Sequence, residues 1–348
     1  MHILTIFTGG TIGCAPPDDR GVMRPATAMG GAAPEEKYYL LKLYRHAHPN
    51  SVVTFETAEP LSTLSEDMTP AKWSVLLNAL KTVDFKRYDG IIITHGTDTL
   101  AYTAALLGLA LAGISTPVVL VSAARNLYHP ESNGLQNFTA ALAVIAATSH
   151  GVYAAFGYEP GRAYVYQGIK MLTSQAFSDR FASLDGEDFG WVENGVFTQA
   201  AVLSPQTARE PLLYTLPDCL APGVQIIEPY PGLDYSSLHL NPAKTRAVLH
   251  GVYHSFTVCA EDGFSAIEFA QSCRERGILP VFAPFAQWLL EGGVRYSSTD
   301  ALLASGALLV PDCTRELAYA ALVLAANLCG TMQESEHWLV REFGWTSN

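Results

Sequence analysis

The sequence predicts an α/β protein of two domains, each built around a parallel sheet, and three observations support this. Apolar runs typical of buried strands alternate with segments of helical periodicity, which favours parallel pairing with right-handed crossovers. The 348 residues are enough for two domains. Four prolines gather at the end of the first alternating region. We therefore expect a larger, mostly parallel N-terminal domain over residues 1–195, a linker over 196–222 and a smaller C-terminal parallel-sheet domain over 223–348.

The expected elements follow from apolar runs and helical periodicity. The clearest helix start has Thr69 as N-cap and Pro70 at the first helical position, followed by one apolar face. In the first domain we expect strands at residues 4–7, 52–55, 91–93, 118–121, 152–156 and 163–166, and helices from 70, over 100–112 and over 135–147. In the second we expect strands at 224–227, 247–249, 281–282 and 308–310, and helices over 263–275 and 315–327.

Composition and charge exclude several classes of protein. An apolar fraction of 49% with 16% charged residues fits a compact globular enzyme rather than a disordered or fibrous chain. The net charge of −12, without a basic tract, argues against a nucleic-acid partner, and no apolar run is suited to a membrane. The six cysteines form no ligand cluster, so we expect free thiols in a reducing compartment. The N-terminus shows no leader pattern, and a cytoplasmic location is expected.

The turn His95-Gly96-Thr97-Asp98-Thr99-Leu100 is the first candidate for a functional site. It follows an apolar run and precedes an Ala/Leu-rich segment, so we expect it to connect a buried parallel strand to a helix. Such turns carry the ligand-binding residues of open α/β sheets. Its hydroxyls and carboxylate would lie where a helix N-terminus favours negative charge. The alternative is that Asp98 or Thr99 only caps the helix.

A glycine-rich turn, Thr8-Gly9-Gly10-Thr11-Ile12-Gly13, follows the first expected strand. Its glycines allow a tight bend and the close approach of a ligand, and they present Thr11 as a hydroxyl. A phosphate-binding loop is the alternative, but the sequence has neither a Gly-Lys-Ser/Thr ending nor a G-x-G-x-x-G pattern. Residues 14–37, rich in Pro and Gly, are expected to form a lid over the active site.

Together, residues 8–13 and 90–100 resemble the signature pair of the bacterial-type asparaginase and glutaminase family, in the family's order. The likeness is closer to its cytoplasmic type I form. Ser65-Glu66-Asp67-Met68 is similar to the family's substrate-binding Ser-x-Asp-Met, and residues 151–156 resemble the strand before its catalytic lysine. The resemblance implies hydrolysis of a small-molecule amino-acid amide by a threonine nucleophile, without metal or organic cofactor, in a homodimer or homotetramer.

By this resemblance, Thr11 is the acylated nucleophile, while Lys170 activates Thr97. Lys170 would act as a base only where burial and neighbouring charges favour its neutral form. Asp98 would orient Thr97 and hold the substrate's α-ammonium group, and backbone N–H groups at Gly96 and Thr97 would stabilise the oxyanion. Ser65 and Glu66 would face the α-carboxylate and α-ammonium ends. The implied catalytic residues are Thr11, Thr97, Asp98 and Lys170, and the implied substrate-binding residues are Gly10, Ser65, Glu66, Gly96, Thr97 and Asp98.

Three stretches depart from the family's pattern. Residues 21–25, aligned with the family's lid tyrosine, contain no Tyr, so either Tyr38 or Tyr39 replaces it or both belong to a half-buried helix. At the next stretch this chain reads Ser122-Ala123-Ala124-Arg125. The family commonly has Thr or Val followed by Gly and then by Ala or Ser, before Gln or Met and an Arg. Loss of the glycine would narrow the pocket or shift its backbone. Gln167-Gly168-Ile169 replace the family's Arg and Thr before the lysine.

The histidines are expected to have lesser roles. His95 precedes the second turn, which favours a buried, hydrogen-bonded structural residue over a general base. His250 and His254 follow a strand of the second domain, where the family brings a second subunit or domain near the active site. We expect surface positions for both, with an auxiliary role at the site as the alternative.

The leading hypothesis is conversion of L-asparagine to L-aspartate and ammonia through an acyl-threonine intermediate. The departures leave two alternatives. One is a shifted substrate, either glutamine or a modified or larger asparaginyl amide, including ammonia supply as an amidotransferase subunit. The other is a catalytically silent amino-acid-binding homologue. The acidic balance argues against the tRNA-dependent form, which should carry a basic surface.

Overall fold

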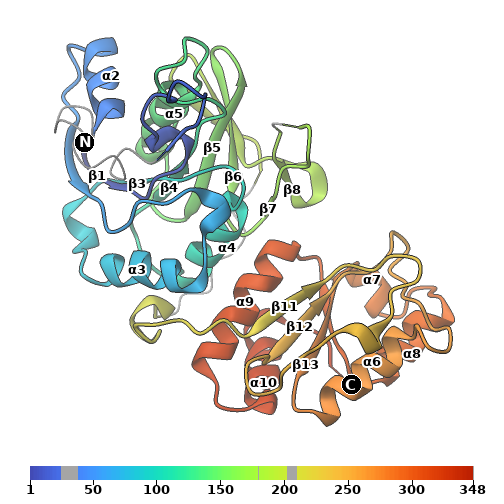
Figure 1. Ribbon diagram of the computed structural model, residues 1–348. Helices are drawn as coiled ribbons and strands as arrows, with labels where there is room; N and C mark the ends of the chain where they lie inside the picture. Colours follow the sequence, from blue (N-terminus) through green and yellow to red (C-terminus); the bar gives the residue numbers. More distant parts are fainter. Residues whose placement is uncertain (25–37, 179, 202–209, 348) are drawn as a thin grey trace. The chain divides into compact units, whose positions relative to one another are not determined.

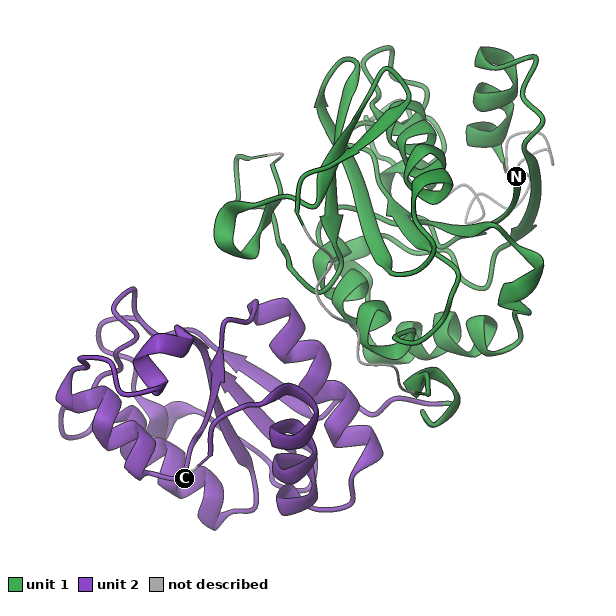
Figure 2. Ribbon diagram, turned by 180° about the vertical axis from the view of Figure 1, so that it is seen from behind, with its two compact units in different colours: residues 1–218 green, residues 219–348 purple. Residues whose placement is uncertain are grey.

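The chain divides into two compact units, Met1–Asp218 and Cys219–Asn348 (Figure 2). The computed structural model describes residues 1–24, 38–178, 180–201 and 210–347. Each unit is an α/β domain with its own sheet, so the predicted fold class is confirmed. Part of the expected linker, residues 202–209, lies outside the described residues. Within the described ranges, no helix combines the length and apolarity that a membrane span requires.

The sheet of the first unit has eight strands in the order β10-β9-β6-β5-β4-β3-β1-β2. The five strands from β2 to β5 in this order pair in parallel, as predicted. The other three continue the sheet in antiparallel pairs. The strands are β1 (His2–Phe7), β2 (Thr54–Ala58), β3 (Gly90–Thr94), β4 (Val118–Val121), β5 (Val152–Glu159), β6 (Arg162–Gln167), β9 (Gly190–Glu193) and β10 (Val196–Gln199).

Strand β10 occupies the first residues of the predicted linker. It forms a hairpin with β9 through Asn194 and Gly195, whose φ angles are 52° and 76°. Asn-Gly is the preferred pair for such a two-residue turn, because both positions need positive φ. The sequence therefore contains a signal for this hairpin. The linker predicted from the prolines starts too early, because its first residues belong to β10.

Helices cover both faces of this sheet, α2 and α5 on one and α3 and α4 on the other (Figure 1). Helix α4 is buried over almost its whole length, which explains why it is uniformly apolar instead of amphipathic. Helix α3 begins as predicted, with the Thr69 hydroxyl accepting a hydrogen bond from the Lys72 N–H. The helices are α2 (Tyr39–Ala47), α3 (Pro70–Lys81), α4 (Leu100–Ala110) and α5 (Gly134–Ala147).

The second unit has a four-stranded parallel sheet in the order β11-β12-β13-β14. Helices α9 and α10 cover one face, and α6 and α8 cover the other (Figure 1). The strands are β11 (Val224–Ile227), β12 (Ala247–His250), β13 (Leu279–Phe285) and β14 (Leu308–Pro311). The helices are α6 (Ala266–Glu275), α7 (Gln287–Leu290), α8 (Ser297–Ala304), α9 (Arg315–Leu328) and α10 (Met332–Phe343).

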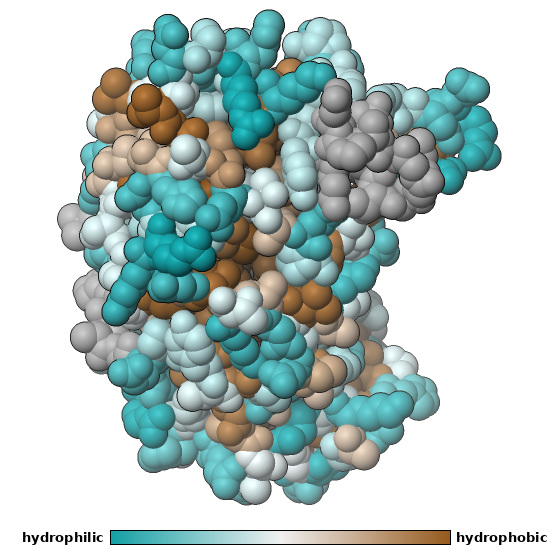
Figure 3. Space-filling model, turned by 90° about the vertical axis from the view of Figure 1, so that its left-hand side faces the viewer, coloured by the Kyte–Doolittle hydropathy of each residue, from teal (hydrophilic) through white to brown (hydrophobic). Residues whose placement is uncertain are grey.

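The surface mixes polar and apolar residues. Figure 3 shows a face on which hydrophilic residues, in teal, surround smaller hydrophobic areas, in brown. A folded protein normally exposes much apolar area, so scattered brown residues carry little information. Hollows with converging polar groups identify a candidate site more directly.

Candidate active site

The two turns singled out in the sequence meet at one edge of the first unit's sheet. Strands β1 and β3 are parallel neighbours, with Phe7 opposite Thr94 at their carboxyl ends. The Thr8 hydroxyl donates a hydrogen bond of 2.5 Å to the Thr94 carbonyl, which joins the two strands at the point where the turns begin. Because both segments of the chain leave the sheet in the same direction, the turns lie close together in space.

Two glycines form the contact between these turns. Gly10 has φ of 73°, and a Cβ placed on it would lie 2.2 Å from the Gly96 nitrogen. No side chain fits at that distance, so glycine at position 10 lets the two backbones touch. Thr11 and Thr97 each lie one residue beyond this contact. The structure thus brings the two predicted threonines to neighbouring turns.

The Asp98 carboxylate is held by Ser65. The Ser65 hydroxyl donates to Asp98 Oδ2 at 2.7 Å and accepts from the Asp98 N–H at 3.3 Å. The Thr99 hydroxyl donates to the Ser65 carbonyl at 2.8 Å. Thr99 is the N-cap residue of α4, but its side chain makes no capping hydrogen bond. Among the residues that the structure describes, no hydrogen bond engages the second Asp98 carboxylate oxygen, which leaves it available to a positively charged group.

His95 anchors the second turn from inside the protein, as expected for a structural histidine. It is buried, and its Nδ1 lies 2.8 Å from the Gly96 carbonyl, which can only accept. Nδ1 therefore carries the proton, and Nε2 accepts from the Thr103 hydroxyl at 2.9 Å. That hydroxyl in turn accepts from Trp73 Nε1 at 2.9 Å. Burial lowers the pKa of His95 to about 4, which favours this neutral tautomer.

Thr11 and Thr97 present half-buried hydroxyls to this edge. Within the described ranges, no hydrogen bond engages either hydroxyl, which leaves both free to meet a substrate. Glu66 is exposed and lies near Cys14, at the end of the first turn. The pKa of the Cys14 thiol is raised to about 11, mainly by burial and to a lesser extent by the negative charge of Glu66. No group of three or more His, Cys, Asp or Glu side chains among the described residues is arranged to hold a metal ion.

Lys170 follows strand β6 and points to a different partner from the one that the resemblance implies. Its Nζ lies 3.9 Å from Asp185 Oδ2, and its side chain is 35% exposed. The Leu184 N–H donates to the Lys170 carbonyl at 2.8 Å, which holds the two segments together. In the described part of the chain, Lys170 forms no hydrogen bond with Thr97 or Asp98. The implied hydrogen-bonded set is therefore not formed in this structure.

A cavity of about 360 Å³ opens directly beside Thr97 and Asp98. A loop between the two-residue strands β7 (Met171–Leu172) and β8 (Ala182–Ser183) forms much of its wall, and these strands pair with each other. The sequence predicts a narrowed or shifted pocket at residues 122–125, yet Ala124 lies at the cavity with its side chain exposed. The described lining residues are Thr97, Asp98, Ala124, Phe156, Thr173, Ser174, Gln175, Ala176, Ser178 and Phe181.

Sequence reasoning missed this loop. Thr173, Ser174 and Gln175 form a run of three hydrogen-bonding side chains just after the predicted lysine, which was a usable signal. The position of this run in the fold depends on the pairing of β7 with β8, and strands of only two residues leave no periodic pattern in the sequence. The loop could not be placed beside Thr97 without the fold.

Part of the predicted lid, residues 25–37, lies outside the described residues. Tyr38 and Tyr39 stand at the start of helix α2 and pack against the core of the first unit. Tyr39 stacks on Tyr128, with ring centroids 4.5 Å apart, and Tyr38 lies against Phe7. This matches the half-buried helix rather than a tyrosine that reaches into the site.

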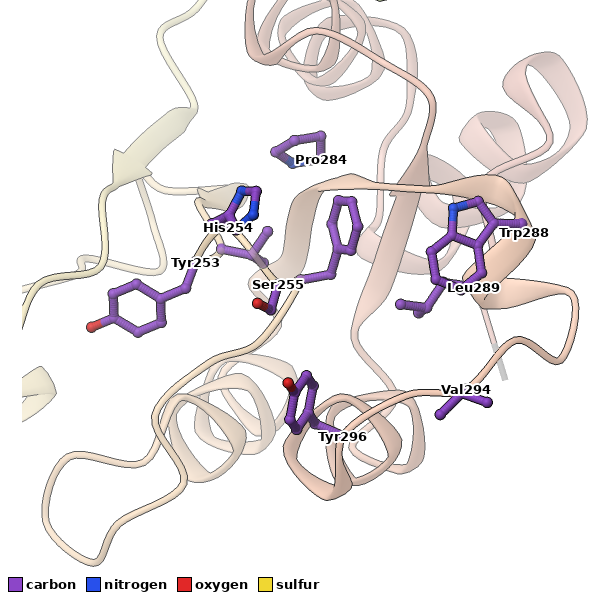
Figure 4. A pocket seen from close by; sticks show the side chains of 10 residues that line it. Tyr253, His254, Ser255, Pro284, Trp288, Leu289, Val294 and Tyr296 are labelled. Carbon is purple, nitrogen blue, oxygen red and sulfur yellow. The ribbon is translucent and has the colours of Figure 1, made fainter.

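The second unit contains a separate cavity of about 560 Å³ with mainly aromatic and aliphatic walls (Figure 4). Trp288 of α7 and Tyr296, just before α8, lie on different sides of it. His254 is among its lining residues, whereas His250 is buried and within 2.8 Å of the Tyr235 hydroxyl. A surface position for His250 was therefore wrong, and burial lowers its pKa.

Comparisons with known proteins agree with the geometry. A family model described as "Asparaginase, N-terminal" matches residues 2–201. The solved structure of the thermostable L-asparaginase from Thermococcus kodakarensis has a TM-score of 0.79 and 25% identity, covering 99% of this chain and 98% of that one.

Two curated relatives carry a different name, because each is a subunit of a glutamyl-tRNA(Gln) amidotransferase. The one from Aeropyrum pernix is 27% identical over 340 residues, covering 92% of this chain and 73% of the relative. The one from Methanopyrus kandleri is 36% identical over 149 residues, covering 41% of this chain and 29% of the relative. The second match therefore spans less than a third of that relative.

Proposed function

Because this chain belongs to the asparaginase family, we propose that it hydrolyses L-asparagine to L-aspartate and ammonia through an acyl-threonine intermediate. The observation that carries the proposal is the contact of Gly10 with Gly96, which sets Thr11 and Thr97 on adjoining turns. The Asp98–Ser65 pair beside them supplies a carboxylate for the substrate's ammonium group. A hydroxyl nucleophile, a second hydroxyl and an anchoring carboxylate are the parts that such a reaction needs.

In this mechanism the Thr11 oxygen attacks the amide carbon of the substrate. Backbone N–H groups at Gly96 and Thr97 stabilise the oxyanion, an effect worth about 3 kcal/mol per donor. As the ester bond forms, the proton of the Thr11 hydroxyl passes by way of Thr97 and Lys170 to the amide nitrogen. The carbon–nitrogen bond then breaks, ammonia leaves and the ester on Thr11 remains. Water then cleaves the ester, releases aspartate and restores the hydroxyl. Ser65 keeps Asp98 oriented, because its one hydroxyl proton is already donated to that carboxylate.

Lys170 serves as the base for Thr97, and this requires it to leave Asp185. Both partners are substantially exposed, at 35% and 66%. Ion pairs of this kind contribute at most about 1 kcal/mol. Substrate binding can therefore redirect the Lys170 side chain toward Thr97 at small cost, and the group acts as a base once its ammonium has given up a proton to water.

The test measures aspartate and ammonia from L-asparagine with the purified chain. We expect Thr11→Ala and Thr97→Ala each to lower kcat/KM by at least about 100-fold, the lower range for general acid–base groups. Thr82→Ala is the matched control, since that hydroxyl only bonds the Ala79 carbonyl at the end of α3. Added hydroxylamine should divert the ester to aspartyl hydroxamate. Turnover retained in both site variants would refute the mechanism.

A second candidate is hydrolysis of glutamine to supply ammonia to a partner subunit. The name of the Aeropyrum pernix relative favours it. One methylene changes discrimination by only about 1–3 kcal/mol, so the same residues could serve either amide. The net charge of −12 argues against direct contact with RNA, so a partner would have to bring the RNA. The ratio of kcat/KM for glutamine to that for asparagine decides between the two.

Location and assembly are part of the proposal. All six cysteines are free thiols, which supports a reducing compartment such as the cytoplasm. A homodimer or homotetramer follows from the family resemblance, and light scattering coupled to size exclusion measures it. A monomeric chain with full activity would contradict the oligomeric part alone.

A further inference from the structure

The cavity beside Thr97 is bounded by the second turn and by the loop after Lys170. Thr97 and Asp98 of the turn line it, and so do several residues of the loop. Ser65 bonds Asp98, yet neither Ser65 nor Glu66 is among the described residues that line the cavity. A substrate whose α-ammonium group is held by Asp98 would have its amide near Thr97, which lines the same cavity.

The space is larger than an unsubstituted amide needs. A volume of about 360 Å³ corresponds to roughly twelve water molecules at about 30 Å³ each. The amide end of asparagine adds only a carbonyl oxygen and an NH₂ group beyond the carbon that reacts. The amino-acid end held by Asp98 would take up part of the volume, and an unsubstituted amide would leave the rest to water. A group attached to the amide nitrogen could occupy it.

The walls indicate which kind of group fits. Phe156 and Phe181 give the cavity an apolar side. Asp98 is the charged side chain among its described lining residues, and it would already face the substrate's α-ammonium. The hydrogen-bonding side chains come from one loop and are Thr173, Ser174, Gln175 and Ser178. Hydroxyl and amide groups without a countercharge match a neutral substituent that carries hydroxyls of its own.

The loop that bears these groups is tied down at both ends. Strand β7 pairs with β8, with Met171 opposite Ser183. The Ser178 N–H donates to the Gln175 carbonyl at 3.0 Å, and the Phe181 N–H donates to the Tyr158 hydroxyl at 2.5 Å. A loop held in this way presents its side chains without a large ordering cost on binding.

We propose that this cavity receives a neutral, hydroxyl-bearing substituent on the amide nitrogen, so that N-substituted asparagines are substrates. The inference rests on the proposed function and names its substrate class. Thr11 Oγ forms the ester bond to the amide carbon as the carbon–nitrogen bond breaks. The nitrogen takes up the proton that the Thr11 hydroxyl loses and leaves as a primary amine instead of ammonia. Water hydrolyses the ester to L-aspartate and the free threonine hydroxyl.

The experiment compares aspartate release from L-asparagine with release from three N4-substituted L-asparagines, which carry 2-hydroxyethyl, ethyl and carboxymethyl groups. We expect kcat/KM for the hydroxyethyl compound to lie within about tenfold of asparagine or above it. It should exceed that of the ethyl compound, which lacks the hydroxyl, and that of the carboxymethyl compound, which Asp98 repels.

Ala124→Met tests the cavity itself, because the larger side chain would project into it. The Ala124 side chain is exposed, so folding should not suffer. We expect the ratio of hydroxyethyl to asparagine turnover to fall at least about tenfold, and Ala71→Met, on the exposed side of α3, to leave the ratio unchanged. Ser174→Ala and Gln175→Ala give a second reading, as a reduced preference for hydroxyethyl over ethyl.

The outcomes separate this inference from the function on which it rests. Turnover of asparagine without any turnover of the substituted compounds overturns the inference and leaves the proposed function standing. An unchanged ratio in Ala124→Met also overturns it. The absence of aspartate from every compound overturns both.

Discussion

Lowering the pH should reduce the free energy of unfolding of the first unit through His95. The native pKa of this buried imidazole is about 4, below the usual 6.5 of the unfolded chain. Above the unfolded value both states are neutral, and His95 makes no pH-dependent difference. As pH falls below it, the unfolded chain binds a proton that the native protein refuses, so the free energy of unfolding decreases until the native pKa is reached.

The size of the effect follows from that difference in pKa. At about 1.36 kcal/mol for each pKa unit, the full window amounts to about 3 kcal/mol. Between about pH 6 and about pH 5 the loss should be about 1 kcal/mol. Protonation of Nε2 would also place a donor against the Thr103 hydroxyl, which already donates to it. Nδ1–H would still donate to the Gly96 carbonyl, but the Thr103 hydroxyl would have to turn its proton away from Nε2.

The assay is urea unfolding at several values of pH for the wild type, His95→Gln and the control His46→Gln, which changes an exposed histidine. We expect His95→Gln to be less stable near neutral pH but to lose about 1 kcal/mol less than the wild type between about pH 6 and about pH 5. His46→Gln should follow the wild type. The buried His250 contributes to all three and cancels in the comparison. Equal pH slopes for wild type and His95→Gln would refute the reasoning.

Three further changes have definite expected results. Ser65→Ala removes the 2.7 Å donor to Asp98, so kcat/KM for asparagine should fall about 10- to 100-fold; steady-state kinetics that show less than a threefold change would contradict the role. Asp185→Asn frees Lys170 from a half-exposed ion pair, so kcat should rise by no more than about fivefold, and a tenfold loss would instead show that Asp185 positions the lysine for catalysis. Phe177 is fully exposed with φ of 64°, so Phe177→Asn should raise the free energy of unfolding by up to about 1 kcal/mol, and a decrease in urea unfolding would reveal a packing role.

The sequence predicted best what depends on neighbouring residues. The strands before the two turns are mainly apolar runs and were predicted from the residues themselves, whereas the meeting of the two turns was implied only by the family resemblance. The N-cap at Thr69 is equally local. The antiparallel extension of the sheet through β9 and β10 depends less on neighbouring residues, although the Asn194-Gly195 pair indicates its hairpin.

Contacts between distant residues were harder to foresee. Nothing near Lys170 in the sequence indicates that Asp185 lies 3.9 Å from its Nζ, because that distance depends on how a loop returns. The hydrogen bond from Ser65 to Asp98 joins residues 33 positions apart. The family resemblance implied one site for these residues, but only the fold shows that Asp98 accepts a hydrogen bond from Ser65 and that the Lys170 ammonium lies near Asp185.

The two flanks of the site differ in how firmly they are held, and this bears on which part of a substrate can vary. On one flank Ser65, Asp98 and His95 are fixed by short, buried or half-buried hydrogen bonds to backbone and side chains. Displacing any of these leaves a polar group unpaired, at a cost of about 1–3 kcal/mol. On the other flank a substantially exposed ion pair holds the Lys170 side chain, which can adjust at small cost. The backbone of the polar loop is held, but in the described part of the chain no hydrogen bond engages the side chains of Ser174 and Gln175. Selection can therefore reshape the flank that meets the amide nitrogen while the flank that grips the amino-acid end stays constant.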